Sequence, residues 1–215
     1  MAIIINEKCH YLIVPGWKGS GSDHWQSHWQ AVLPQASRIQ VTDWDLPRFD
    51  DWIEAIERAV SRLEGPIVLI AHSLGCISIA HWTTRSAFTY KIAAAMLVAP
   101  ADVEQGPARR NLKAFAPIPG TPLPFTSLVV GSTNDWSASR QRIEHFANAW
   151  GSICHIIANV GHINVESGHS HWPEGLYLLS HLTREIAPET PGTHYCEDQH
   201  SRFRTARSVG SAAAR

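Results

Sequence analysis

The sequence predicts a three-layer α/β/α fold, in which about six mostly parallel strands lie between two layers of helices. Short apolar runs rich in β-branched residues alternate with longer amphipathic stretches, as in repeated strand and helix units. Most of these runs are apolar at consecutive positions, which is typical of strands that helices cover on both faces. The chain has 215 residues, of which 44% are hydrophobic, so it can bury one core of its own.

Six short runs are expected to form the strands, in the order 11–14, 38–42, 67–71, 94–98, 127–130 and 153–157. Five longer stretches lie between or after them and are expected to be the covering helices, at 24–33, 51–63, 74–86, 138–150 and 172–185. The third helix begins directly after the third strand, which leaves room only for a tight turn between them.

The helix at 51–63 shows the amphipathic pattern most clearly. Its apolar residues recur at helical spacing and its charged residues occupy the opposite face. The apolar set is Trp52, Ile53, Ile56, Ala59, Val60 and Leu63. This face is expected to lie on the sheet. Asp50 or Asp51 is expected to cap the start of the helix by accepting hydrogen bonds from its first N–H groups, and Gly65-Pro66 is expected to end it.

Residues 1–187 are expected to form one domain, because the α/β pattern continues through them without an internal repeat or a long linker. From residue 188 the pattern is lost among Pro, Gly, Ser, Thr and Arg residues, so 188–215 are expected to be a disordered tail. The arginines of this tail could contact nucleic acid, but Glu189, Glu197 and Asp198 offset most of their charge, and we assign the tail no function.

The overall composition argues against several classes of partner. Lys and Arg number 18 against 19 Asp and Glu, and a net charge of −1 gives no general attraction to nucleic acid or anionic lipid. The longest apolar run, 92–101, is too short to span a membrane, and the start of the chain lacks signal-peptide features, so we expect no membrane insertion and a cytoplasmic location. A protein partner is not indicated.

The four cysteines form no C-x-x-C pair and are expected to be reduced thiols; they are Cys9, Cys76, Cys154 and Cys196.

The strongest functional motif is Ala71-His-Ser-Leu-Gly75, where an apolar strand runs directly into a helix. Small residues two before and two after Ser73 let strand and helix pass closely, as in a nucleophile elbow, although Ala71 replaces the more common first glycine. The alternative is that Ser73 is an ordinary helix N-cap.

The expected partners of Ser73 follow later strands, in the order that α/β hydrolases use. Asp135 comes just after the strand at 127–130, and His162 just after the strand at 153–157. An imidazole can take the serine proton, and a carboxylate fixes the imidazole tautomer and stabilises its charged form. Ser73, Asp135 and His162 therefore form a candidate catalytic triad. Taken singly, Asp135 could instead be a turn and cap residue, and His162 an ordinary loop histidine.

An oxyanion hole requires two backbone N–H donors beside the nucleophile. The first is expected from Leu74, the residue after Ser73, and the second from Trp17, in the glycine-containing turn after the first strand. Trp17 and Trp136 are also possible walls of the pocket, although both could instead fill the core. The other tryptophans considered are expected to be core residues; they are Trp29, Trp52, Trp82 and Trp150.

Other constellations give weaker signals. His24 and His28 lie one helical turn apart, and His169 and His171 follow later, but no carboxylate or cysteine joins them at ligand spacing. We expect helix-surface histidines and no metal site. The glycines at 16–21 fit neither phosphate-binding motif, so no cofactor is expected. Cys76 is expected to be a small buried packing residue.

Beyond the serine motif, the chain contains a set of short motifs spread over about residues 10 to 185. They are Val14-Pro-Gly-Trp17, Asp23-His-Trp-Gln26, Thr42-Asp-Trp-Asp45, Ala71-His-Ser-Leu-Gly75, Leu97-Val-Ala-Pro100, Pro117-Ile-Pro119, Pro122-Leu-Pro-Phe125, Gly161-His-Ile-Asn164, Glu166-Ser-Gly168 and Trp172-Pro-Glu-Gly175. With these motifs the chain resembles the small retinoblastoma-binding-protein-nine-like (YdeN-type) serine hydrolases of the α/β-hydrolase superfamily. The resemblance implies a compact hydrolase with the triad Ser73, Asp135 and His162 and no large lid. This chain departs from the pattern at Trp136, where a proline is common.

These features together predict a serine hydrolase that cleaves small carboxylic esters through an acyl-enzyme. Hydrolases often insert a cap between residues equivalent to Asp102 and Phe125, but here the segment is short and rich in proline, which predicts an open, shallow cleft for a small-molecule acyl substrate. The alternatives are an amidase or peptidase with the same triad and a non-catalytic protein-interaction module that keeps the fold.

Overall fold

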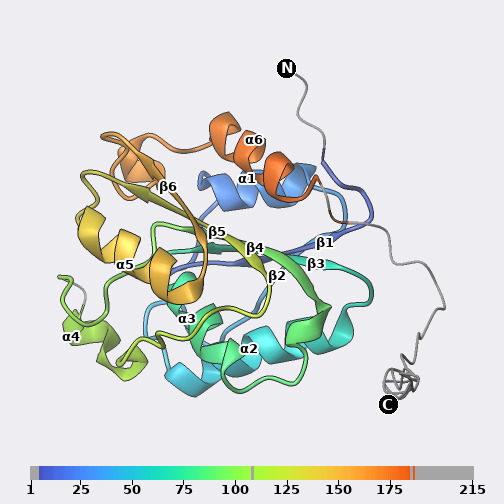
Figure 1. Ribbon diagram of the computed structural model, residues 1–215, viewed down its shortest axis with the longest axis horizontal. Helices are drawn as coiled ribbons and strands as arrows, with labels where there is room; N and C mark the ends of the chain where they lie inside the picture. Colours follow the sequence, from blue (N-terminus) through green and yellow to red (C-terminus); the bar gives the residue numbers. More distant parts are fainter. Residues whose placement is uncertain (1–4, 108, 185, 187–215) are drawn as a thin grey trace, which may run out of the picture.

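Six strands form one sheet in the order β2-β1-β3-β4-β5-β6, and every neighbouring pair is parallel (Figure 1). The computed structural model describes residues 5–107, 109–184 and 186. The strands are β1 (His10–Val14), β2 (Ala36–Arg38), β3 (Ile67–His72), β4 (Ile92–Val98), β5 (Thr126–Ser132) and β6 (Ile153–Ile157). The predicted fold class is confirmed.

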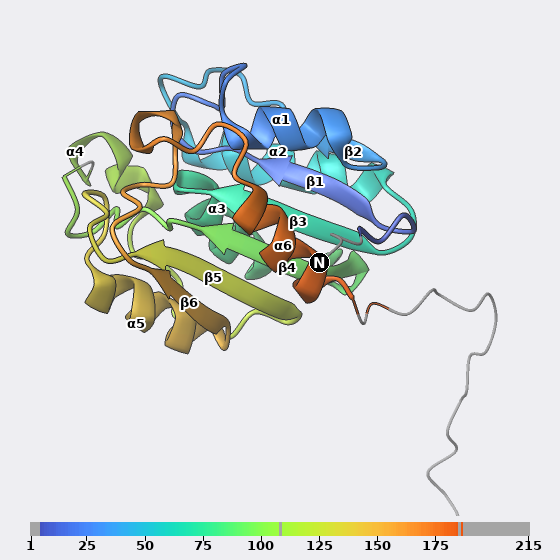
Figure 2. The same ribbon diagram turned by 90° about the horizontal axis from the view of Figure 1, so that it is seen from above.

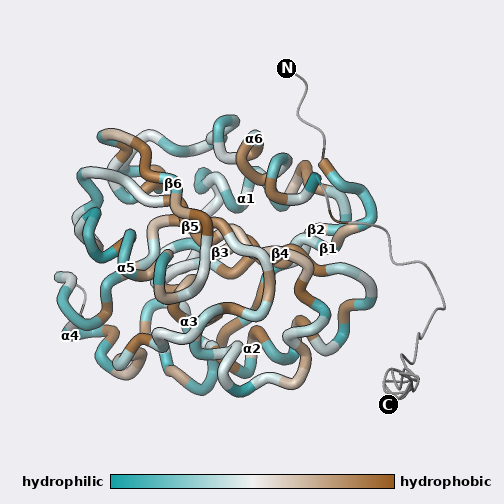
Figure 3. Tube along the Cα trace, viewed as in Figure 1, coloured by the Kyte–Doolittle hydropathy of each residue, from teal (hydrophilic) through white to brown (hydrophobic). Residues whose placement is uncertain are grey.

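Two hydrophobic cores lie on opposite faces of this sheet. Along β3, Ile67, Leu69 and Ala71 join one core, whereas Val68 and Ile70 join the other. All six residues of β3 are buried, which explains why this strand is apolar at consecutive positions. Figure 3 shows the hydrophobic residues concentrated along the central strands.

Helices cover both faces, as the three-layer prediction requires (Figures 1 and 2). On one face lie α1 (Trp25–Val32) and α6 (Pro173–Leu182), and on the other lie α2 (Phe49–Arg62), α3 (Leu74–Thr83) and α5 (Arg140–Trp150). Four predicted core tryptophans are at most 1% exposed; they are Trp29, Trp52, Trp82 and Trp150. The remaining helical segments are one turn long: η1 (Thr89–Lys91), α4 (Arg109–Leu112), η2 (Lys113–Phe115) and η3 (Val165–Ser167).

The second strand and the cap of α2 were predicted wrongly. The strand is Ala36–Arg38 rather than 38–42: Arg38 pairs with Ile13, and since β1 ends at Val14, the residues after Arg38 have almost no neighbouring strand to pair with. The carboxylate of Asp51 accepts hydrogen bonds from the N–H and the hydroxyl of Thr42, each at 2.8 Å. Helix α2 starts at Phe49 with Arg48 as N-cap, and no side chain caps it. Asp50 and Asp51 therefore lie in its first turn, where a negative charge favours the helix dipole.

The segment between β4 and β5 contains only α4 and η2, so the described part of the chain has no large cap (Figure 2). Among the described residues, no helix has the length and apolar character to cross a bilayer. The three cysteines in this part of the chain are free thiols, and Cys76 is buried as predicted. The predicted tail at 188–215 and Cys196 lie outside the described residues.

A buried ion pair holds the segment after β4 against α5. Arg142 donates from Nε to Asp102 at 2.7 Å and from Nη2 to Glu104 at 2.6 Å. The side chain of Asp102 is 2% exposed, and its Oδ1 also accepts the backbone N–H groups of Glu104 and Gln105. The loop that forms one side of the site described below is therefore fixed to α5 through a desolvated charge.

Replacing Arg142 with methionine should reduce the free energy of unfolding by about 3 kcal/mol, because the Asp102 charge would stay buried without a cation. Chemical denaturation measures this change. Arg140→Met is the matched control on the same helix: its partner Glu144 is 43% exposed on the side chain, so this substitution should leave the denaturation midpoint almost unchanged. Equal effects of the two substitutions would contradict the structural role of Arg142.

Candidate active site

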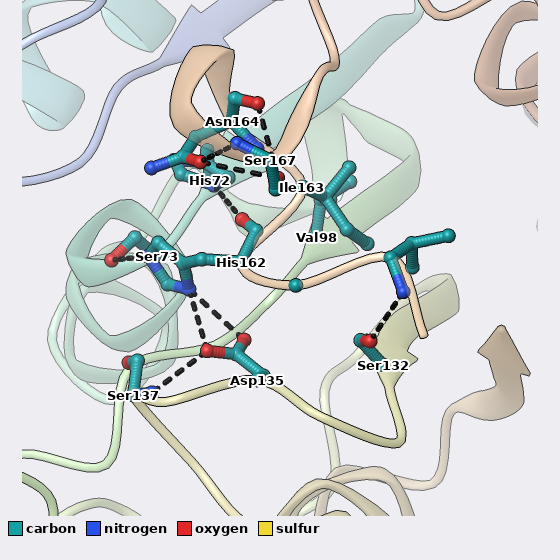
Figure 4. Close-up of polar contacts among 12 residues, drawn as sticks. His72, Ser73, Val98, Ser132, Asp135, Ser137, His162, Ile163, Asn164 and Ser167 are labelled. Carbon is teal, nitrogen blue, oxygen red and sulfur yellow. Dashed lines mark hydrogen bonds and ion pairs between the residues drawn. The ribbon is translucent and has the colours of Figure 1, made fainter. Parts of the chain in front are cut away.

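The three predicted triad residues come from turns at the carboxyl ends of three strands. Ser73 lies between β3 and α3, Asp135 follows β5, and His162 follows β6. Because all strands are parallel, their carboxyl ends lie at one edge of the sheet. Figure 4 shows the three side chains meeting there.

Ser73 occupies a strained turn that close packing enforces. Its φ of 54° and ψ of −119° lie in a region that residues with a side chain rarely adopt. A Cβ on Gly75 would overlap the carbonyl oxygens of Val14 and Pro15, and one on Gly16 would come within 2.8 Å of the Ser73 Cβ. Only glycine fits at these crossings, whereas Ala71, the unusual residue of the motif, is accommodated in the core with no exposed surface.

Hydrogen bonds link the three side chains into one relay. The Ser73 hydroxyl lies 3.0 Å from Nε2 of His162, and Nδ1 of His162 lies 2.9 Å from both carboxylate oxygens of Asp135. Ser73 is the N-cap of α3 but makes no capping hydrogen bond with its side chain. Since the carboxylate only accepts, Nδ1 carries the proton, and Nε2 is free to accept the serine proton. This arrangement can activate a hydroxyl for attack on a carbonyl carbon.

Asp135 does not cap α5, whose N-cap is Ser139. Its side chain is fully buried, and its Oδ1 also accepts the backbone N–H of Ser137 at 2.7 Å. The acid is thus held by the relay and by its own loop. Figure 4 shows Asp135 between Ser137 and His162.

Two polar residues that were not predicted as site residues join the loop of Asp135 to the loop of His162. Asn134 Oδ1 accepts the Gly161 N–H at 2.8 Å, and the Ser132 hydroxyl accepts the Val160 N–H at 3.1 Å. These bonds fix the loop just before His162. The signal available in the sequence was a pair of short polar residues, Ser132 at the end of β5 and Asn134 directly before Asp135.

The two predicted oxyanion donors flank the Ser73 turn. Leu74 is the first residue of α3, and an N–H in the first turn of a helix has no acceptor within that helix. Trp17 follows Gly16, which packs directly against Ser73. The Trp17 ring is half-buried, and its Nε1 donates to the carbonyl of Asp45 at 2.9 Å, which fixes its orientation.

A cleft of about 270 Å³ opens in front of Ser73 and His162. Trp17 and Trp136 both line it, and Trp17 also packs against the hydrophobic core. Trp136 is 54% exposed, and its ring centre lies 5.1 Å from that of His162. The volume lies just below the range typical of pockets for drug-sized ligands, which suits a small substrate.

Two further histidines, neither of them predicted as site residues, belong to the site. His72 directly precedes Ser73, and its Nε2 donates to the backbone carbonyl of His162 at 2.9 Å. Its ring centre lies 4.8 Å from that of His162. Complete burial lowers the pKa of His72 well below its ordinary value, and the neighbouring His162 and His24 act in the same direction. A neutral His72 therefore supports the main chain of the expected base.

His24 is not the helix-surface residue that was predicted. It is only 6% exposed and forms the N-cap of α1, where its Nδ1 accepts the Gln26 N–H at 3.2 Å. Burial, followed by the charge of Arg38, lowers the pKa of His24 to about 4. His28 stacks on His171 at 4.1 Å instead. In the described part of the chain, no three His, Cys, Asp or Glu side chains gather as a metal site requires.

The lowered pKa of His24 predicts a loss of stability in acid. In the unfolded chain this group takes up a proton as the pH falls through about 6.5, whereas in the folded protein it stays neutral until about pH 4. Unfolding therefore becomes easier as the pH falls through this window. Between about pH 7.5 and pH 5, His24 should account for a loss of about 2 kcal/mol.

Guanidinium unfolding at the two pH values, on the wild type and on His24→Asn, measures this contribution. Asparagine also caps helices but does not titrate, so the variant should lose about 2 kcal/mol less than the wild type over the same interval. Parallel losses in the two proteins would show that His24 is solvated and ordinary.

Comparisons with known proteins agree with this architecture. The family model described as serine hydrolase matches residues 11–181. In structure, the chain is similar to a protein from Pectobacterium atrosepticum described as a YdeN-like hydrolase, with 33% identity over 84% of this chain and 94% of that chain, and a TM-score of 0.75. No curated protein matches the chain significantly in sequence.

Two more distant structures show the shared fold alone. The ydeN gene product of B. subtilis has 20% identity over 83% of this chain and 100% of that chain, with a TM-score of 0.66. An esterase from a Rhodococcus species has 12% identity over 85% of this chain and 93% of that chain, with a TM-score of 0.62.

Proposed function

Because this chain belongs to the serine hydrolase family, with YdeN-like hydrolases among its structural relatives, we propose that it cleaves small carboxylic esters through an acyl-enzyme on Ser73. The observation that carries the proposal is the continuous hydrogen-bond relay from Ser73 through His162 to Asp135. Each member has the chemistry that its position requires: a nucleophile, a base and a buried carboxylate.

The first half of the reaction forms the acyl-enzyme. The Ser73 oxygen attacks the ester carbonyl carbon while its proton moves to Nε2 of His162, and Asp135 stabilises the resulting imidazolium. The N–H groups of Leu74 and Trp17 donate hydrogen bonds to the oxyanion of the tetrahedral intermediate. The bond between the carbonyl carbon and the alcohol oxygen then breaks, and His162 returns the proton to the departing alcohol.

The second half uses water in place of the alcohol. His162 takes a proton from a water molecule, whose oxygen attacks the acyl carbon and displaces Ser73. The carboxylic acid leaves, and His162 gives the proton back to Ser73. Both half-reactions proceed without a cofactor, because the ester, water and the three side chains supply every atom and proton that moves.

The shape of the cleft supports a small acyl group. Trp17 and Trp136 stand at its sides, and the short segment after β4 contributes Ala101 and Leu112 rather than a lid. A long acyl chain would remain largely in water at such a site and would gain little from binding. Specificity for short esters follows.

A series of p-nitrophenyl esters with acetyl, butanoyl, octanoyl and dodecanoyl groups tests this proposal. We expect kcat/KM to be highest for the short esters and to fall for the long ones, and a fluorophosphonate probe to label the protein covalently. Faster cleavage of matched p-nitroanilides would favour an amidase. No turnover together with no covalent adduct would favour a non-catalytic interaction module.

A further inference from the structure

His24 lines the cleft, yet the proposed reaction does not use it. The Ser73 hydroxyl pairs with Nε2 of His162, and Nδ1 of His162 pairs with both carboxylate oxygens of Asp135. His24 is the N-cap of α1, and its ring contacts that of His72, which in turn contacts that of His162. Its role in the cleft depends on which of its ring nitrogens carries a proton.

The backbone settles the tautomer of His24. The N–H of Gln26 donates to Nδ1 at 3.2 Å, so Nδ1 must be unprotonated. The depressed pKa keeps the ring neutral at the pH of an ordinary assay. A neutral imidazole with an unprotonated Nδ1 carries its proton on Nε2. His24 is therefore a fixed donor at Nε2.

This donor has access to solvent. Within the described residues, the hydrogen bond recorded for the His24 side chain is the one to Gln26. Among the described residues, two side-chain nitrogens are buried without a hydrogen-bond partner: Nε of Arg38 and Nε1 of Trp52. Nε2 of His24 is not one of them, so this atom keeps some exposed surface. Since Nε2 is neither paired nor sealed, it belongs to the small exposed part of His24, and His24 lines the cleft.

The ring is held rigidly in this position. It makes an edge contact with His72 at 4.9 Å between ring centres and a tilted contact with Trp25 at 5.4 Å. With Nδ1 bound to the helix N-terminus, rotation of the ring would lose the cap. A rigid neutral donor in a partly desolvated cleft selects a ligand oxygen more strongly than a mobile, solvated one.

We propose that His24 is a substrate-binding residue whose Nε2–H donates to a second oxygen of the substrate, so the enzyme prefers short esters that carry an ether, hydroxyl or carbonyl oxygen close to the scissile ester. This rests on the proposed esterase function and adds a substrate class to it. Such an oxygen satisfies the donor, whereas a plain alkyl chain covers it and leaves it without an acceptor.

The test compares substrates that differ by one replacement of CH₂ with oxygen. p-Nitrophenyl methoxyacetate and p-nitrophenyl butanoate form the acyl-side pair, and 2-methoxyethyl butanoate and butyl butanoate form the alcohol-side pair. The variant is His24→Asn, which can still cap α1 but withdraws the donor from the cleft because its side chain is shorter. His28→Asn, one helical turn further along, is the matched control.

For at least one pair, His24→Asn should lower kcat/KM for the oxygen-containing ester about 10-fold more than for its alkyl partner, mainly through KM. Comparing wild type and variant within a pair cancels the intrinsic reactivity of each ester. A purely structural role of His24 would lower both members of a pair equally, and that result in both pairs would overturn the inference. His28→Asn should leave both ratios unchanged.

Two further results keep the interpretation clear. If His24→Asn does not fold, as judged by thermal unfolding, His24→Ser provides a second N-cap that lacks the imidazole Nε2–H and whose short side chain does not reach into the cleft. If the wild type hydrolyses none of the four esters and takes no fluorophosphonate label, the proposed function fails and this inference with it. Turnover with equal losses, by contrast, overturns only the role of His24.

Discussion

Ser73→Ala should abolish covalent labelling by fluorophosphonate and lower kcat for short esters by about 10⁴–10⁶-fold. The substitution removes the only oxygen that lies within hydrogen-bond distance of Nε2 of His162 among the described contacts. Alanine fits the space, because the turn is set by Gly16 and Gly75 rather than by the hydroxyl. Residual activity would come from the N–H donors and from binding alone. Mass spectrometry of the labelled protein and ester kinetics measure both effects.

The matched control is Ser152→Ala. Ser152 directly precedes β6, at the opposite end of the sheet from the cleft, and its hydroxyl pairs with that of Ser127 at 2.7 Å. This variant should take the label at the wild-type rate. Persistent labelling of Ser73→Ala would mean that another residue is the nucleophile and would refute the proposed mechanism.

Asp135→Asn should lower kcat by about 10⁴-fold while changing KM little. In the wild type both carboxylate oxygens accept from His162, and Oδ1 also accepts from the Ser137 N–H. Asparagine has one acceptor oxygen, and if the Ser137 N–H takes it, the amide NH₂ faces His162. Nδ1 must then accept, the ring proton moves to Nε2, and the serine proton has nowhere to go.

Asp43→Asn is a suitable control, because Asp43 also accepts backbone N–H groups in a turn, those of Asp45 and Leu46, and its recorded contacts include no histidine. It should keep its activity within about threefold, as expected of a surface substitution. If Asp135→Asn kept more than about a tenth of the wild-type kcat, the carboxylate would not be what orients His162.

The order and type of the elements followed from local patterns. Consecutive apolar residues such as those of β3 arise because both faces of the sheet are covered, and that pattern is readable within six positions. The position of β2 was misjudged because the partner strand β1 ends at Val14, one residue after the Ile13–Arg38 pair, and strand propensity does not encode where a neighbouring strand ends. After its arrival at the sheet the chain continues as a loop, in which the carboxylate of Asp51 accepts the Thr42 N–H that no strand pairs.

The architecture and the three residues proposed as the triad could be predicted from local sequence, because the turn around Ser73 and the strand ends before Asp135 and His162 each lie within a short stretch of chain. The other groups that surround these three residues depend on contacts between distant parts of the chain. Ser73 and His162 are 89 positions apart, and the bond from His72 to the His162 carbonyl spans 90. Whether His24 lies on a helix surface or in the cleft depends on the packing of α1 against the sheet, and burial, not residue type, sets its charge state.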